Sequence, residues 1–156
     1  MAYNIIKPTL ADIPAMREIV NIEVKNGNIL ERSEDEMANA IRSYHIIKDD
    51  ESGEIAGFCA LYIYSKDLAE VRSLVVKDTL RGQGLGSKLI QKAIDEGRAL
   101  GIKEILTLTY RAHLFQRLGF VIIDKSLLPN HKIWADCIKC KHFPICDEIA
   151  LINKLS

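Results

Sequence analysis

Several kinds of segment are missing from this 156-residue sequence, and each absence narrows what the protein can be. No apolar run approaches the roughly 18 residues of a membrane span, and the N-terminus lacks a basic stretch followed by an apolar core. We therefore expect no membrane partner, no secretory signal and a cytoplasmic location. Internal repeats, low-complexity tracts and linkers are also missing, so we expect one domain over residues 1–156.

The sequence has no excess of charge of either sign. Lys and Arg together number 21, as do Asp and Glu, so the formal net charge is zero. Without a positive field or a long run of one charge, nothing recruits nucleic acid or an anionic membrane. A small-molecule partner fits this composition better, and a homodimer is left open.

Cysteine is scarce except in one short segment. Cys59 lies in an apolar run, whereas Cys137, Cys140 and Cys146 fall within ten residues, with His142 among them. In a cytoplasmic protein such a cluster holds free thiols or a metal rather than disulfides. The four donors could surround a tetrahedral Zn²⁺, but the ligands are closely spaced and Pro144 stiffens the chain between them. We expect free thiols and no metal, and zinc remains the alternative.

The most informative feature that is present is a glycine-rich turn between an apolar strand and a helix. Residues 71–90 read VRSLVVKDTLRGQGLGSKLI, with glycines at 82, 84 and 86. Glycines remove side chains from the turn, so backbone N–H groups can approach an anion that also faces the positive end of the helix dipole. The pattern predicts a phosphate-binding loop.

Spacing excludes the two commonest loops of this kind. A P-loop ends in Gly-Lys-Ser/Thr, but here Gly86 is followed by Ser87 and then Lys88. The dinucleotide fingerprint needs a further glycine where Ser87 or Leu89 stands. Neither a nucleoside triphosphate nor a dinucleotide is therefore the expected ligand.

Hydrophobic periodicity predicts a mixed α/β order of elements. Period-2 apolar runs predict strands over 3–7, 44–48, 54–64, 68–76, 105–109, 120–124 and 148–152. Helices are expected after Thr9, after the Ser33–Glu36 capping box, from the glycine loop to Gly101 with Leu100 facing inward, and over 112–118.

The glycine string, Arg81-Gly82-Gln83-Gly84-Leu85-Gly86 after Val75-Val76, resembles the acetyl-CoA pyrophosphate loop of the GNAT acyltransferase superfamily. The resemblance implies a GNAT-like, mostly antiparallel central sheet of about seven strands with about four helices, and acetyl-CoA as co-substrate. It also implies a cofactor site along the strand end and the loop, made of Leu74, Val75, Val76, Arg81, Gly82, Gln83, Gly84, Leu85, Gly86 and Ser87.

Acetyl transfer to an amine needs a base for the amine and an acid for the departing thiolate. Glu70 lies on the strand before the loop, where strict alternation would put it on one face with Arg72, Leu74 and Val76. We expect Glu70 to be the base, although it could instead be a solvated or Arg72-paired carboxylate. Tyr110 follows the strand 105–109, where GNAT enzymes often place a tyrosine near the CoA sulfur, so it is the expected acid; an ordinary half-buried aromatic is the alternative.

Four further segments, 27–33, 67–76, 108–120 and 128–137, resemble in order the acetyltransferase part of the N-acetylglutamate synthase family. The resemblance implies L-glutamate as acceptor, as in arginine biosynthesis, with Glu70 as base and with Arg32 and Lys132 at substrate carboxylates. Arg72 and Ser73 complete the expected substrate site, since an arginine fork binds a carboxylate bidentately. The kinase-like domain that confers arginine feedback in long relatives is missing from this sequence. Other amines as acceptors, and a non-catalytic acetyl-CoA-binding module, remain alternatives.

Overall fold

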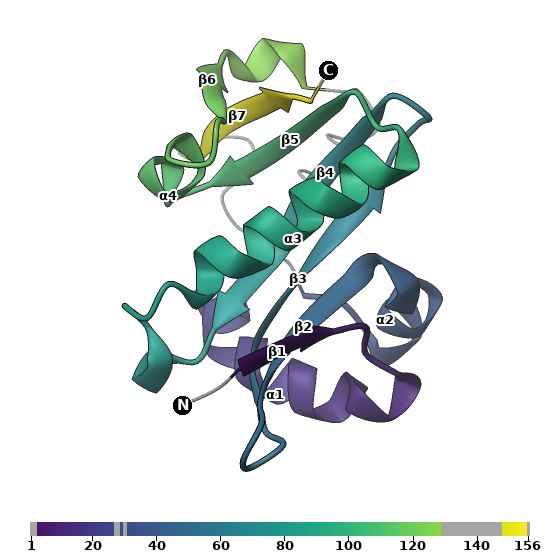
Figure 1. Cartoon of the computed structure of the whole chain (residues 1–156), viewed down its shortest axis with the longest axis vertical. Helices are drawn as coiled ribbons and strands as arrows, with labels where there is room; N and C mark the ends of the chain where they lie inside the picture. The colour runs from purple at the N-terminus through teal and green to yellow at the C-terminus, as the bar shows by residue number, and fades with distance from the viewer. Residues whose placement is uncertain (1–2, 27–28, 30, 129–147, 156) are drawn as a thin grey trace.

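The computed structural model describes residues 3–26, 29, 31–128 and 148–155, which form a seven-stranded sheet in the order β1-β2-β3-β4-β5-β7-β6 (Figure 1). The strands are β1 (Tyr3–Ile6), β2 (Tyr44–Asp49), β3 (Ile55–Ile63), β4 (Leu68–Val76), β5 (Glu104–Thr109), β6 (Val121–Ile123) and β7 (Ile149–Lys154). In this described part, the β4–β5 pair is parallel and the other neighbouring pairs are antiparallel. The predicted mixed, mostly antiparallel sheet is confirmed.

The α-helices of the described residues are α1 (Ile13–Lys25), α2 (Glu34–Asn39), α3 (Leu85–Leu100) and α4 (Ala112–Gln116). Short 3-10 helices occur at Leu10–Asp12, Ile41–Ser43, Asp78–Leu80 and Lys125–Leu127. α3 crosses one face of the sheet, which we call the α3 face and which α4 also covers (Figure 1). α1 and α2 cover the opposite face, called here the α1 face.

Each face has its own hydrophobic core. On the α3 face, buried residues of the central strands pack against Leu85, Leu89, Ala93 and Phe115. On the α1 face, Phe58 and Val75 pack against Met16 and Met37. A third cluster around Leu106 and Ala150 continues the α1 face toward β7. The sheet is therefore buried on both sides along its middle strands, which accounts for their nearly continuous apolar runs.

The predicted capping residues are found at the start of α2 and at the end of α3. Ser33 Oγ accepts from Glu36 N at 3.1 Å and Glu36 Oε1 accepts from Ser33 N at 3.0 Å, so the capping box begins α2. Gly101 ends α3 with φ 85°, a left-handed conformation that glycine adopts readily.

The prediction that Leu100 faces inward is wrong, because 58% of its surface is exposed. Ile102, just beyond the Gly101 turn, is 5% exposed and fills the core in its place.

None of the helices in the described part of the chain is both long and apolar enough to cross a membrane. The cysteine and histidine cluster at 137–146, for which free thiols are expected with zinc as the alternative, lies outside the described residues. Cys59 is a free, buried thiol on the α3 face, and burial raises its pKa to about 12.

Candidate active site

The glycine-rich turn lies where β4 passes through the 3-10 turn Asp78–Leu80 into α3 (Figure 1). Gly82 and Gly84 have φ of 85° and 79°, and a Cβ at either position would meet no atom within 4 Å. Glycine is thus required there by backbone conformation and not by lack of space. The first intrahelical bond runs from Lys88 N to Gly84 O at 3.1 Å. The amides that precede Lys88 therefore point out of the helix end, as an anion site requires.

A β-bulge in β4 changes the predicted faces of this strand. Phe58 pairs with Val75 and Ala60 pairs with Arg72, so Ser73 and Leu74 together oppose Cys59. Ser73 takes φ 57°, which is unusual for a residue other than glycine.

The prediction that Glu70, Arg72, Leu74 and Val76 share one face is wrong beyond Arg72, because the extra residue shifts the alternation. Val76 belongs to the core of the α3 face, whereas Val75 belongs to that of the α1 face. The bulge also brings Ser73 to the wall of a pocket on the α1 face.

β4 and β5 separate toward their carboxyl ends (Figure 1). Their ladder, within the described residues, joins Leu68–Glu70 to Glu104–Leu106 and goes no further. Just past it, Thr107 Oγ1 donates to Val71 O at 2.9 Å, so a side chain replaces the next rung. The rest of the β4 edge, which runs toward the glycine turn, keeps backbone donors and acceptors that β5 does not use.

Glu70 lies at the point where the two strands begin to separate. It is 1% exposed, and its Oε1 accepts a hydrogen bond from Tyr64 Oη at 2.7 Å. The Tyr64 ring meets Tyr62 edge-on with centroids 5.0 Å apart, and Arg72 Cζ lies 3.7 Å above the Tyr62 ring. The carboxylate is therefore not solvated, and Arg72 stacks on an aromatic ring.

Tyr44 lies beneath the bulge at the base of the pocket. Burial raises its pKa, and Arg32, Arg72 and a side-chain hydrogen bond with Ser73 act in the opposite direction. Arg32, Arg72 and Ser73 therefore each lie near the Tyr44 phenol. Three predicted substrate residues are thus brought together.

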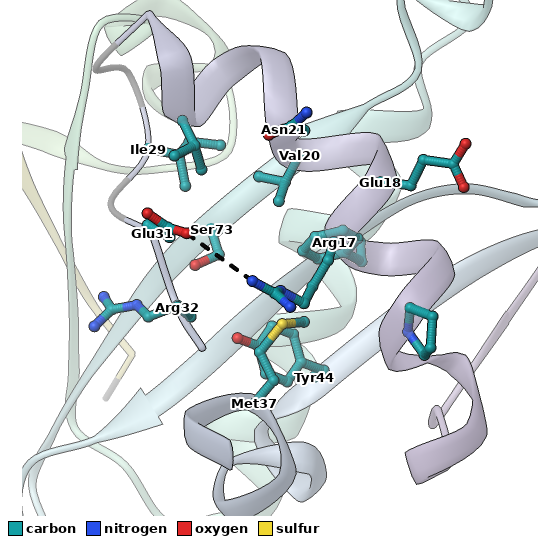
Figure 2. A pocket seen from close by; sticks show the side chains of 13 residues that line it. Arg17, Glu18, Val20, Asn21, Ile29, Glu31, Arg32, Met37, Tyr44 and Ser73 are labelled. Atoms are coloured by element: carbon teal, nitrogen blue, oxygen red, sulfur yellow. Dashed lines mark ion pairs between the residues drawn. The ribbon is translucent and has the colours of Figure 1, made fainter. Parts of the chain in front are cut away.

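The pocket on the α1 face has a volume of about 280 Å³ and lies between α1, the segment before α2, and the middle strands (Figure 2). It is lined by Pro14, Arg17, Glu18, Val20, Asn21, Val24, Ile29, Glu31, Arg32, Met37, Tyr44, Phe58 and Ser73. Arg17 was not among the predicted residues. Its position in the sequence, four residues after Ile13 and three before Val20, puts it beside the apolar face of α1, but this position alone does not distinguish it from a solvated surface charge.

The other predicted residues are more dispersed. Tyr110 follows β5 and is 40% exposed, and Arg111 N beside it donates to Thr109 Oγ1 at 2.9 Å. Arg81, at the start of the glycine turn, forms a 3.1 Å ion pair with Asp78. Lys132 lies outside the described residues.

A strand that separates from its parallel neighbour, followed by a glycine turn at the start of a long helix, defines an acyltransferase fold, and comparison with known families agrees. The model of the acetyltransferase (GNAT) family matches residues 14–120, and the chain belongs to this family.

Particular relatives are similar over most of the chain. An uncharacterized N-acetyltransferase of Chlorobaculum tepidum is 36% identical over 146 residues, which are 94% of this chain and 92% of the relative. An amino-acid acetyltransferase of Pasteurella multocida is 31% identical over 80% of this chain but only 28% of its own length.

Among solved structures, N-acetylglutamate synthase from Neisseria gonorrhoeae, complexed with coenzyme A and N-acetyl-glutamate, superimposes with a TM-score of 0.86 at 23% identity. The match covers all of this chain and 36% of that one. At this level of identity the likeness shows the fold.

Proposed function

We propose that this acetyltransferase transfers the acetyl group of acetyl-CoA to the α-amine of an amino acid, with L-glutamate as the acceptor. The observation that carries the proposal is the arginine-containing pocket on the α1 face, which meets β4 at Ser73 in the bulge, three residues beyond Glu70. Amino-acid acetyltransferase relatives, and a structural neighbour solved with coenzyme A and N-acetyl-glutamate, support it.

The donor is assigned to the strand end and glycine turn. The amides at the start of α3 would bind the diphosphate of CoA, and the edge of β4 from Leu74 to Val76, which β5 does not pair with, would bind the amide groups of the pantetheine arm. The backbone amides of Gln83, Leu85 and Ser87 would belong to the same diphosphate site. The thioester would then lie between the separating ends of β4 and β5, with Glu70 at one side of the opening.

The acceptor is assigned to the pocket, where a carboxylate needs a cation that is already held in place. Arg32 lines the pocket, and Arg72 approaches it from β4. Guanidinium groups bind carboxylates bidentately, so they would fix the α-carboxylate and direct the neighbouring amine toward β4. Lys132 remains a predicted substrate residue.

In the proposed reaction the neutral amine attacks the thioester carbonyl, a C–N bond forms and the C–S bond breaks. Glu70 accepts the proton that the amine loses, directly or through water, and Tyr110 donates a proton to the CoA thiolate. The products are the N-acetyl amino acid and CoA with its free thiol. Glutamate acetylation would place the chain in arginine biosynthesis in the cytoplasm, as the family resemblance implies.

The decisive experiment incubates the purified protein with acetyl-CoA and a panel of glutamate, glutamine, other amino acids, a peptide N-terminus and a polyamine, and follows thiol release. We expect glutamate to give the highest kcat/KM. Glu70→Gln should lower kcat by about 10² to 10⁴-fold, the usual contribution of a general base. Glu51→Gln, which changes an exposed acid in the β2–β3 turn, is the matched control.

Different results contradict different parts of the proposal. Thiol release with a peptide or polyamine, but not with any acidic amino acid, would overturn the acceptor. CoA binding without turnover of any amine would favour the non-catalytic module. Full activity in Glu70→Gln would overturn the assignment of the base while leaving the overall reaction in place.

A further inference from the structure

Arg17 lines the pocket on the α1 face, where it lies close to two acidic side chains. It comes from the second turn of α1, and 38% of its side chain is exposed. In Figure 2 its guanidinium points across the pocket toward Ser73 and Glu31. In the same view Arg32 lies on the other side of Ser73, so the two arginines line the pocket from different segments of the chain.

Two carboxylates of the protein itself hold Arg17. Its Nη2 is 3.9 Å from Glu31 Oε1, and its Nη1 is 3.6 Å from Glu34 Oε1. Both distances are long for a charge-assisted hydrogen bond, and the acidic side chains are 71% and 62% exposed. Exposed pairs of this kind contribute about 0 to 1 kcal/mol. A ligand carboxylate with bidentate geometry could therefore displace them at small cost.

The positions of the two arginines divide their roles. Arg32 acts electrostatically on Tyr44 together with Arg72 of β4, and it lines the pocket with Ser73 of β4, so we assign it to the β4 side of the pocket. The α-carboxylate of an amino acid is attached to the carbon that bears the reacting amine, and so it must lie on that side. A second carboxylate, farther along the acceptor, would reach toward α1.

We propose that Arg17 is a specificity-determining residue that binds the side-chain carboxylate of an acidic acceptor, in competition with Glu31 and Glu34. This inference rests on the proposed function. It adds that the preference for a dicarboxylic over a neutral amino acid comes from α1, and that the two glutamates weaken this binding. Glutamate binds by replacing these two long ion pairs with one bidentate ion pair.

The test compares kcat and KM for glutamate and glutamine in the wild-type protein and in Arg17→Gln. A hydrogen-bonded charge pair is worth about 1.5 to 3 kcal/mol, so KM for glutamate should rise roughly 10 to 100-fold. KM for glutamine, and kcat for both acceptors, should stay within about twofold. Arg98→Gln, at an exposed position in the last turn of α3, is the control. Arg17→Lys should recover only part of the glutamate affinity, because an ammonium lacks the fork.

The glutamates provide the second half of the test. Glu31→Gln combined with Glu34→Gln should lower KM for glutamate by up to about fivefold, the equivalent of one exposed ion pair. The same pair of changes should have no effect in the Arg17→Gln background, since coupled residues are not additive. Equal rises in KM for glutamate and glutamine in Arg17→Gln, or no rise at all, would overturn the inference. A wild-type protein that acetylates neither acceptor would overturn the proposed function instead.

Discussion

His45 lies on the strand β2 with 3% of its surface exposed, and its Nε2 is 3.6 Å from Glu96 Oε2 on α3. Lys7 Nζ lies 2.8 Å from the same carboxylate oxygen. Burial is the main cause that lowers the pKa of His45 from 6.5; Lys7 and Lys92 lower it further, and Glu96 opposes them. The folded protein therefore favours the neutral imidazole.

The first prediction is a loss of stability in mild acid. Because the folded pKa of His45 is lower than the unfolded one, its contribution is fully present above the unfolded pKa of 6.5 and is lost as the pH falls through the folded value. Chemical unfolding at a series of pH values should show the free energy of unfolding falling from about pH 7 to pH 5. His45→Gln should flatten this slope, and His113→Gln, at an exposed position, should not. Equal slopes in all three proteins would contradict the prediction.

Single residues differ in how far the sequence could predict them. Glu70 and Ser73 could be proposed as site residues from the sequence because they lie on the strand that leads into the glycine turn. Arg17 could not, since a charged residue at the border of an amphipathic helix looks like any solvated surface charge. Its position in a pocket depends on the segment after α1 folding back beside it, and that contact joins residues with no local pattern in common.

At the level of elements, the turn before α3 requires a left-handed backbone conformation at Gly84. Gly84 has φ 79° and is the N-cap of α3, whereas Gly86 lies within the helix, where a Cβ would be 3.6 Å from Leu114 Cδ2, an ordinary contact. Gly84→Ala should lower the free energy of unfolding by about 1 to 2 kcal/mol, the cost of a left-handed conformation in an L-residue.

Gly86→Ala is the matched control, and it should leave stability unchanged or raise it, since alanine favours a helix over glycine. Denaturant unfolding measures both, and calorimetric titration with CoA should show weaker binding for Gly84→Ala because the amides of the turn would reorient. Equal stability of the two variants would contradict this account of the turn.

The order of strands and helices was predictable because the period of the apolar residues changes from two to about 3.6 at each boundary. The bulge in β4 was not, because no glycine marks it: Ser73 itself takes the positive φ. The opposing register of β3 and β4 forces the extra residue there, and register is a property of two strands. Strict alternation of side chains along β4, applied without its partner strand, therefore assigns Val76 to the wrong face.

For the whole molecule, the sheet is joined at its centre by a short ladder. Three register pairs connect β4 to β5, whereas six connect β5 to β7. α3 spans the junction on one face, where its Gly97 lies so close to β5 that a Cβ would be 3.0 Å from Ile105 Cδ1. The candidate active site lies where this ladder ends, so the separation of the strands that would admit a thioester also limits the backbone bonding between the two halves.

The hydrogen bond from Thr107 Oγ1 to Val71 O lies at the end of this ladder, so it contributes to the stability of the sheet at the edge of the candidate active site. Thr107 is 2% exposed, and its hydroxyl satisfies a carbonyl that the separated strands leave without a ladder partner. Thr107→Val keeps the shape of the side chain but removes the donor, so the free energy of unfolding should fall by about 1 to 3 kcal/mol, the cost of a buried unsatisfied carbonyl. Thr79→Val, at an exposed position, is the control and should change stability by less than about 0.5 kcal/mol.

Amide exchange separates this effect from general loosening. If Thr107 holds the two halves together, amides of β4 and β5 next to the end of the ladder should exchange faster in Thr107→Val, while those of the β2–β3 pair keep their protection. Uniform acceleration across the sheet would mean that the bond supports only global stability.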